Sequence, residues 1–327
     1  MKIAAMFGEK KGGLIDVPDL KATENFALVK VLVVPMCTEF KMFANGHKGQ
    51  GFGHEAAGEV MVAGGSGHLK AGDRVVVMPL YGCGTCELCL RGDYIFCRES
   101  FNAAKVTGSD AGHYTYGQYL LKPDHLLVRI PDDISIEHGS MACCGLGPTF
   151  GAMQRMGVNK FDTVVITGMG PVGLGGVVNA VFRGARVIAV ESHPYRAELA
   201  KQLGAHEIVD PRDNTAAVKR IDDLTDGKGA DKAIDCSGVA AAQRLLIDSV
   251  KRRGQVAFVG EAGELAIKVS DDMIRKGLTL VGSWHFNLGD SFQLMEVIRG
   301  SHRLLDKLIT HTFPMSRVQE AWELQTR

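Results

Sequence analysis

Short apolar runs separated by glycine-rich turns characterise the first 145 residues of the chain. The turn sequences GGSGH (64–68) and AGD (71–73) separate runs that have the residue types of β-strands. These runs lie at residues 27–34, 58–62, 74–78 and 125–130. The pattern predicts a compact domain built mostly from strands.

From about residue 148 the pattern changes, and buried strands alternate with helices. The segments TVVIT (163–167) and ARVIAVE (185–191) are continuous apolar runs, and a helical segment follows each of them. The second of these helices is expected to end at Gly204. Four more strands are expected, in the segments HEIVD, KAIDCSG, QVAFVG and LTLVGSW. Six strands interleaved with helices predict a doubly wound parallel sheet.

The two patterns divide the chain into two domains, and 327 residues are enough to form them. We expect the first domain to span residues 1–147 and the second to span residues 148–287. The tail at 288–327 has the pattern of two helices, and we expect it to return and complete the first domain. The expected fold class is therefore α/β.

Charge and hydropathy exclude several kinds of partner. The 37 lysines and arginines equal the 37 aspartates and glutamates, so we expect no overall positive field that would attract nucleic acid or an anionic membrane. No apolar run approaches the ~18 residues of a membrane span, and the N-terminal residues lack the pattern of a secretory signal. We expect a cytoplasmic protein that binds neither nucleic acid nor a membrane.

Four of the eight cysteines form the strongest local signal. The segment CGTCELCLRGDYIFC places Cys83, Cys86, Cys89 and Cys97 within fifteen residues. Thiolates suit tetrahedral zinc, and four of them close the coordination of a structural site. Iron–sulfur clusters also use four cysteines, but their spacings differ and usually include a shorter final gap. The spacing therefore predicts a structural zinc.

The segment GMGPVG (168–173) matches the dinucleotide-binding fingerprint, because it follows an apolar strand and opens a helix. Gly168 would permit the tight turn, Gly170 the approach of the pyrophosphate, and Gly173 the close packing of helix on strand. Glu191 ends the next strand, where a carboxylate accepts hydrogen bonds from the adenosine ribose and favours NAD, whereas Arg196 could receive the 2′-phosphate of NADP. The expected cofactor-binding residues are Gly168, Gly170, Pro171, Val172, Gly173, Glu191 and Arg196.

Together with the segments GHEAAGEV (53–60) and AGDRV (71–75), these motifs and their order resemble the zinc-containing medium-chain alcohol and polyol dehydrogenases. The resemblance covers nearly the whole chain. It implies a GroES-like β-rich catalytic domain and a Rossmann domain, with the active site in the cleft between them. It also implies NAD-dependent oxidation of a small-molecule alcohol, with a polyol, a sugar or a cyclitol among the candidates, possession of two Zn²⁺ ions per chain, and a homodimer or homotetramer.

The resemblance further implies the ligands of a catalytic zinc. His54 corresponds to the family's zinc-binding histidine, and Glu55 to the neighbouring carboxylate. Cys144 lies where the family places its third ligand, and Cys37 is the natural first ligand. The adjacent Cys143 is expected to be a buried bystander.

The residues after Cys37 depart from the family, in which a Ser or Thr and then an Asp follow the cysteine after one intervening residue. Without a gap, Glu39 replaces the hydroxyl residue and Phe40 replaces the Asp. With a one-residue deletion, Thr38 and Glu39 fill the two roles. A third register puts Met36 at the ligand position, which is disfavoured because a thiolate binds zinc better than a thioether. Thr38 or Glu39 is thus the candidate proton relay, unless both are ordinary turn residues.

Two other functions stay open at this stage. A zinc-free quinone or enone reductase would share the fold but lack the Cys/His/Cys set and the cysteine-rich segment. A non-catalytic NAD-binding protein would be favoured by loss of the catalytic ligands, and the unusual MCTEF segment keeps this alternative open. The chain ends at AWELQTR, earlier than the family's usual closing strand, so we expect a short C-terminal stretch to lie outside this sequence.

Overall fold

The structure, a computed structural model, describes residues 1–23, 25–65 and 67–326. The chain forms two compact units. The first unit comprises residues 1–143, 287–299 and 309–327, and the second comprises residues 144–286 and 300–308. The predicted domain boundaries differ from these units at three places. Residues 144–147 and 300–308, predicted in the first domain, lie in the second unit, and residue 287, predicted in the second domain, lies in the first unit. Residues 300–308 pack on the second unit, where the Lys307 ammonium donates to the Gln202 carbonyl at 2.9 Å.

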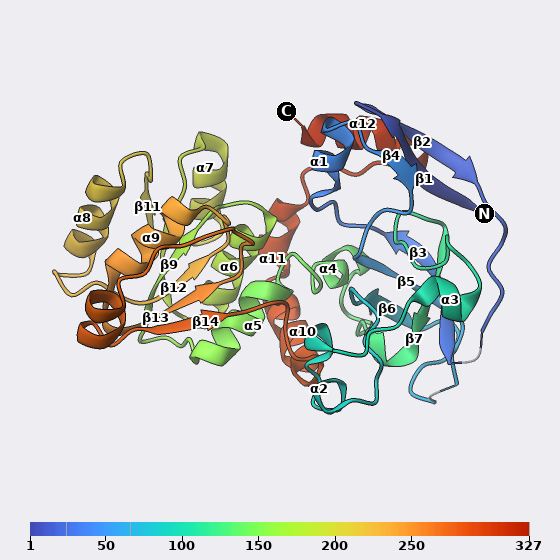
Figure 1. The fold of residues 1–327 in the computed structure, drawn as a ribbon, viewed down its shortest axis with the longest axis horizontal. Coiled ribbons are helices and arrows are strands. Elements are labelled where there is room, and N and C mark those ends of the chain that lie inside the picture. The colour runs from blue at the N-terminus through green and yellow to red at the C-terminus, as the bar shows by residue number, and fades with distance from the viewer. Residues whose placement is uncertain (24, 66, 327) are drawn as a thin grey trace. The chain divides into compact units, whose positions relative to one another are not determined.

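The first unit contains a five-stranded antiparallel sheet with the order β7-β3-β5-β6-β8, of which Figure 1 labels β3, β5, β6 and β7. Alternating residues of these strands bury one cluster that includes Val29, Val60 and Val75. The strands are β3 (Phe26–Val33), β5 (Ala56–Val62), β6 (Arg74–Val77), β7 (Tyr119–Pro123) and β8 (Leu127–Arg129). The predicted runs coincide with four of these strands, and β7 was not predicted.

A second sheet of the first unit has three strands in the order β2-β1-β4. Trp322 closes the cluster beneath it, with its ring centroid 5.5 Å from Phe43 and 5.8 Å from Tyr116. The sheet was not predicted. Its strands are β1 (Lys2–Gly8), β2 (Lys11–Asp16) and β4 (Lys48–Gln50). The helices of this unit are α1 (Glu39–Ala44), α2 (Glu87–Leu90), α3 (Ala103–Thr107), α4 (Ile136–Ser140), α10 (Ser291–Gly300) and α12 (Val318–Gln325).

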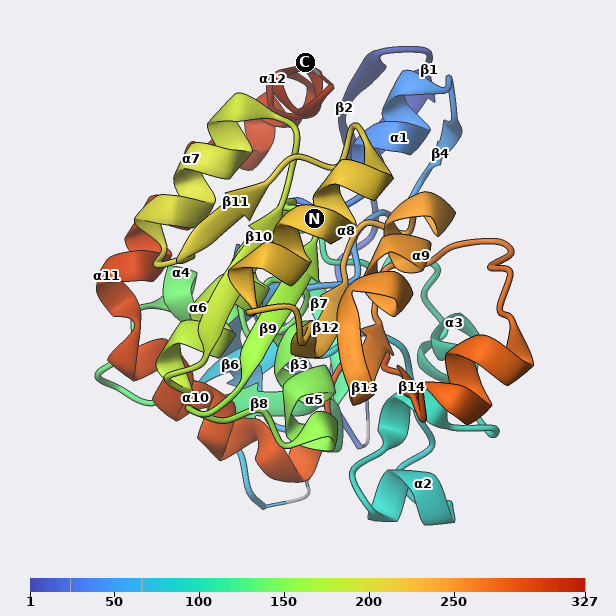
Figure 2. The same cartoon turned by 90° about the vertical axis from the view of Figure 1, so that its left-hand side faces the viewer.

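The second unit is built on a six-stranded parallel sheet with the order β11-β10-β9-β12-β13-β14, which confirms the doubly wound prediction (Figure 2). The chain order reverses between β10 and β12, on either side of β9, and ligands of such sheets bind beyond the carboxyl ends of the strands at this point. The strands are β9 (Thr163–Thr167), β10 (Arg186–Val190), β11 (Glu207–Val209), β12 (Ala230–Asp235), β13 (Val250–Phe258) and β14 (Thr279–Gly282).

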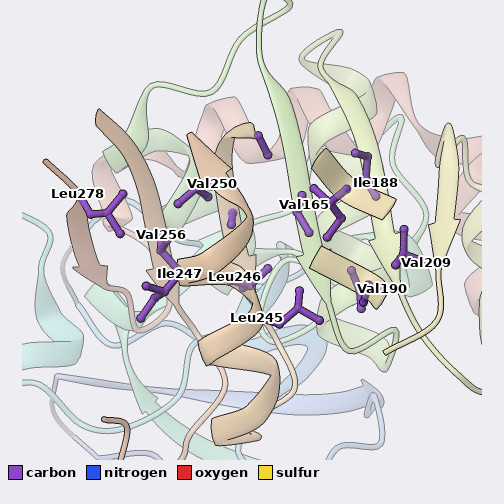
Figure 3. Packing of buried hydrophobic residues seen from close by; sticks show 14 residues of the cluster. Val165, Ile188, Val190, Val209, Leu245, Leu246, Ile247, Val250, Val256 and Leu278 are labelled. Carbon is purple, nitrogen blue, oxygen red and sulfur yellow. The ribbon is translucent and has the colours of Figure 1, made fainter. Parts of the chain in front are cut away.

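Neighbouring residues of β9 show that helices cover both faces of this sheet. Val165 packs with Leu245 and Leu246 of α9 in one buried cluster (Figure 3). Ile166 points to the other face, where its side chain lies against Gly176 of α6. The helices are α5 (Gly147–Met156), α6 (Pro171–Phe182), α7 (Pro194–Gln202), α8 (Asn214–Leu224), α9 (Ala240–Ser249) and α11 (His302–Leu305). No helix among the described residues is long and apolar enough to cross a membrane.

Candidate metal and dinucleotide sites

The four cysteines of the segment 83–97 converge on one point of the first unit. Their sulfur atoms all lie within 4.8 Å of one another. The Sγ atoms of Cys83 and Cys89 are 3.9 Å apart, and those of Cys86 and Cys97 are 3.8 Å apart. A tetrahedron of sulfurs at about 2.3 Å from a central zinc has edges of about 3.8 Å. The donor set and its spacing therefore fit a structural zinc.

Local hydrogen bonds tune these thiols. Bonds from the Thr85 hydroxyl and amide and from the Cys86 amide lower the pKa of Cys83 to about 6. Burial instead raises the pKa of Cys89 to about 12. Because thiolates are the species that bind metals, the chain already favours one charged sulfur, and a cation would stabilise the others.

Replacing Cys89 with serine should lower the zinc content by about one ion per chain, because the closed four-sulfur site loses a ligand. The dinucleotide-binding unit should keep its fold. Metal analysis of the purified variant measures the effect. The matched control is Cys236→Ser, since Cys236 is a half-buried cysteine outside the groups of side chains that could hold a metal. Unchanged zinc stoichiometry in Cys89→Ser would rule out the structural site.

A second group of metal-binding side chains contains the four residues implied by the resemblance. Cys37, His54, Glu55 and Cys144 offer ligand atoms within 4.8 Å of one another. Cys37 precedes α1, His54 and Glu55 precede β5, and Cys144 directly follows the last residue of the first unit. Two thiols, an imidazole and a carboxylate form a donor set suited to a catalytic zinc. Cys143 is buried next to this group.

Glu39 supports two members of this group. Its Oε1 lies 3.2 Å from the Nδ1 of His54, and its Oε2 accepts the Cys37 amide at 3.1 Å. The Glu39 side chain is buried, and hydrogen bonds with Cys37 and then with Glu39 raise the pKa of His54 to about 10. With Nδ1 directed to Glu39, Nε2 would be the nitrogen that binds a metal. Glu39 thus stands where a carboxylate supports a ligating histidine.

The other residues near Cys37 have different surroundings. Thr38 is exposed, and its hydroxyl makes no capping bond at the start of α1. The Gln325 side chain of α12 donates to the Cys37 carbonyl at 2.9 Å. Sequence reasoning missed Gln325, because this contact joins residues 288 positions apart.

The fingerprint glycines lie at the carboxyl end of β9, where the turn into α6 begins. Gly168 has φ +81°, a left-handed conformation that favours glycine, and a Cβ on Gly173 would be 1.9 Å from the Gly168 carbonyl oxygen. A Cβ on Gly170 would meet no protein atom within 4 Å. Gly170 is the N-cap of α6 and provides no side-chain cap, so the first amides of the helix remain for an anion. Pro171 and Val172 begin the helix. The residues present therefore fit a dinucleotide pyrophosphate.

Glu191 follows β10 and is tied to the fingerprint turn. Its Oε2 accepts the Met169 amide at 3.0 Å, and its Oε1 accepts the Ser192 and His193 amides at 2.8 Å each. A carboxylate has room for further hydrogen bonds on these oxygens. Arg196 lies exposed in the first turn of α7.

Comparisons with known proteins identify the family of this chain. Residues 23–132 match the alcohol dehydrogenase GroES-like domain, and residues 171–299 match the zinc-binding dehydrogenase family. The zinc-type alcohol dehydrogenase-like protein YphC of Escherichia coli K12 is 36% identical over 84% of this chain and 78% of its own. The chain belongs to the zinc-containing medium-chain dehydrogenase family. Among other members of this family, sorbitol dehydrogenase of Bacillus subtilis is 30% identical over 99% of this chain and 93% of its own.

The fold of this medium-chain dehydrogenase is also that of a solved alcohol dehydrogenase. The enzyme TADH from Thermus sp. ATN1 superposes with a TM-score of 0.86, covering 100% of this chain and 97% of its own at 24% identity. At 24% identity this likeness shows the fold alone. The family implies zinc and a nicotinamide dinucleotide in general, and its named members are oxidoreductases that act on alcohols and polyols.

Proposed function

We propose that this protein is a zinc-dependent dehydrogenase that transfers a hydride between an alcohol and NAD. The observation that carries the proposal is the convergence of Cys37, His54 and Cys144 in one group, with Glu55 beside them. A zinc-free reductase has no need for this donor set. A non-catalytic protein has no need for the buried carboxylate of Glu39 that holds His54. The proposal includes a second, structural zinc on the four-cysteine segment.

In the proposed catalytic site Cys37, His54 and Cys144 would hold a zinc ion. A zinc ion there would supply Lewis acidity, which favours loss of the alcohol proton at neutral pH. Both Glu39 oxygens already contact His54 or Cys37, so Glu39 would orient the ligand histidine and raise its basicity. The exposed Thr38 hydroxyl is then the group that can pass the alcohol proton to solvent.

The proposed substrate is a polyol or a related small alcohol. The support is the nearly full-length similarity to a protein named sorbitol dehydrogenase. The residues that select among alcohols are not identified by this similarity, so a screen of polyols, sugars and simple alcohols should establish the substrate. The predicted homo-oligomer and the predicted cytoplasmic location remain predictions.

We expect the enzyme to use NAD at least about tenfold more efficiently than NADP, because the Glu191 carboxylate would repel a 2′-phosphate. Comparison of kcat/KM for the two cofactors measures the preference. In Glu191→Gln the ratio of kcat/KM for NAD to kcat/KM for NADP should fall. Glu198→Gln, in which an acid within α7 is replaced, should leave the preference unchanged. A clear preference of the unmodified enzyme for NADP would mean that Arg196, rather than Glu191, governs the choice.

A further inference from the structure

A buried carboxylate at the end of β12 gathers hydrogen bonds from several loops of the second unit. Asp235 has 0% of its surface exposed. Its Oδ1 accepts the Thr167 hydroxyl at 2.8 Å, the Ser237 amide at 3.0 Å and the Ser237 hydroxyl at 2.6 Å. Its Oδ2 accepts the Gly238 amide at 3.2 Å and the Gln243 side-chain amide at 2.9 Å. These five donors are neutral, so they stabilise the carboxylate through hydrogen bonds rather than an ion pair.

The same hydrogen bonds fix the turn that opens the fingerprint. Thr167 ends β9 and directly precedes Gly168. A Cβ on Gly168 would be 2.8 Å from the backbone of Ser237, so the loop after β12 lies directly against this turn. The next residue, Met169, donates its amide to Glu191. Asp235 is therefore connected through Thr167 and Ser237 to the backbone that joins the fingerprint to Glu191.

The backbone of Asp235 also holds the loop that follows β13. Its carbonyl accepts the amides of Val259 at 3.0 Å and Gly260 at 2.9 Å. A Cβ on Gly260 would be 2.3 Å from the Gly238 nitrogen and 3.0 Å from Oδ2 of Asp235. The loops after β9, β12 and β13 thus meet at one residue, at the edge of the sheet where a dinucleotide would bind.

We propose that Asp235 is a positioning residue for the dinucleotide. It holds the backbone of the fingerprint turn in the position that binding of the pyrophosphate requires. This inference rests on the proposed function, since it assumes that the dinucleotide occupies this edge. The physical reason is the high cost of leaving a buried hydrogen-bond donor without a partner. Without the carboxylate, Thr167, Ser237 and Gly238 must find other acceptors, and the backbone around Gly168 must shift.

The test is the variant Asp235→Asn, which keeps the shape but turns one acceptor into a donor that faces other donors. We expect the Kd for NADH to rise about tenfold or more. We also expect KM for NAD to rise by a larger factor than kcat falls. Titration of NADH fluorescence measures Kd without reference to turnover, and denaturant unfolding measures stability in parallel.

Asp231→Asn is the matched control, because Asp231 lies near the other end of the same strand. Its Oδ2 accepts the Thr163 amide of β9 at 2.7 Å, and its Oδ1 pairs with Lys251 at 2.5 Å. This variant should lose stability but keep the Kd for NADH.

Ser237→Ala is a milder second variant that removes the shortest hydrogen bond to Asp235, from the Ser237 hydroxyl, and keeps the bond from the backbone amide. It should raise Kd several-fold even if Asp235→Asn fails to fold.

The outcomes separate the inference from the proposed function. If the unmodified protein does not bind NADH, the proposed function fails and the inference fails with it. If the unmodified protein binds NADH and the folded Asp235 and Ser237 variants bind it equally well, the inference alone is overturned. An equal rise in Kd for Asp231→Asn would also overturn it, because loss of stability would then explain the effect.

Discussion

Replacing His54 with alanine should abolish alcohol oxidation while NAD binding is retained. The imidazole is the one nitrogen ligand in the proposed catalytic group, and its loss leaves a site that cannot hold zinc in the required coordination. A Lewis acid contributes several kcal/mol of transition-state stabilisation, so kcat/KM should fall on the order of a thousandfold or more. Turnover with the best alcohol, together with zinc content and the Kd for NADH, measures the three expected effects.

The control for this variant is His47→Ala, since His47 is an exposed histidine of the first unit outside the candidate metal groups. It should keep full activity and both zinc ions. Normal turnover in His54→Ala would show that the proposed mechanism is wrong. Loss of NADH binding together with turnover would instead show that the substitution disturbs more than the metal group.

The second large effect is expected for Glu39→Gln. A carboxylate that hydrogen-bonds a ligating histidine without itself binding the metal typically contributes about 10–100-fold to metal affinity or activity. We expect kcat/KM to fall by a factor of this size. The structural reason is the 3.2 Å contact between Glu39 Oε1 and His54 Nδ1. Glu59→Gln, which alters an acid of β5, should have little effect on turnover. Wild-type activity in Glu39→Gln would reduce Glu39 to an ordinary turn residue.

The same variant should change how zinc uptake depends on pH. In the metal-free protein the pKa of His54 is raised to about 10, so below that pH zinc must displace a proton from the imidazole. Zinc affinity should therefore rise with pH as the imidazole and the two thiols lose their protons, and the contribution of the imidazole should end once the His54 pKa is passed. Because the Glu39 carboxylate helps to raise this pKa, the contribution of the imidazole should level off at a lower pH in Glu39→Gln. Competition titrations with a zinc chelator at several pH values measure the levelling point.

The fold of the second unit could be predicted from the sequence because its strands are continuous apolar runs between helices. The segment 163–167 is a strand with the predicted bounds, and the glycines of GMGPVG mark the turn that follows it. The small sheet of the first unit gave no such signal. The strand Lys48–Gln50 is three residues long and fully exposed, and its existence depends on pairing with β1, more than forty positions away.

The candidate sites divide in the same way. The spacing of Cys83, Cys86, Cys89 and Cys97 is local, so the sequence alone predicts that they meet. The sequence alone does not predict which residue after Cys37 supports the ligand histidine, because moving the alignment with the family by one residue leaves the local pattern almost unchanged. Only the contact between Glu39 and His54 distinguishes the registers, and it depends on the packing of α1. The role of Asp235 could not be predicted for a similar reason, since its hydrogen-bond partner Thr167 is 68 positions away.

The central claim is that this chain oxidises an alcohol with NAD and needs the metal held by Cys37, His54 and Cys144. The most direct measurement is the rate of NADH formation from a polyol panel before zinc removal, after zinc removal and after zinc is restored. We predict turnover of at least one polyol, loss of that turnover when the catalytic zinc is removed, and recovery on adding zinc. Undiminished turnover in protein shown to be free of zinc, or no NADH formation from any polyol or alcohol by fully zinc-loaded protein, would contradict the claim.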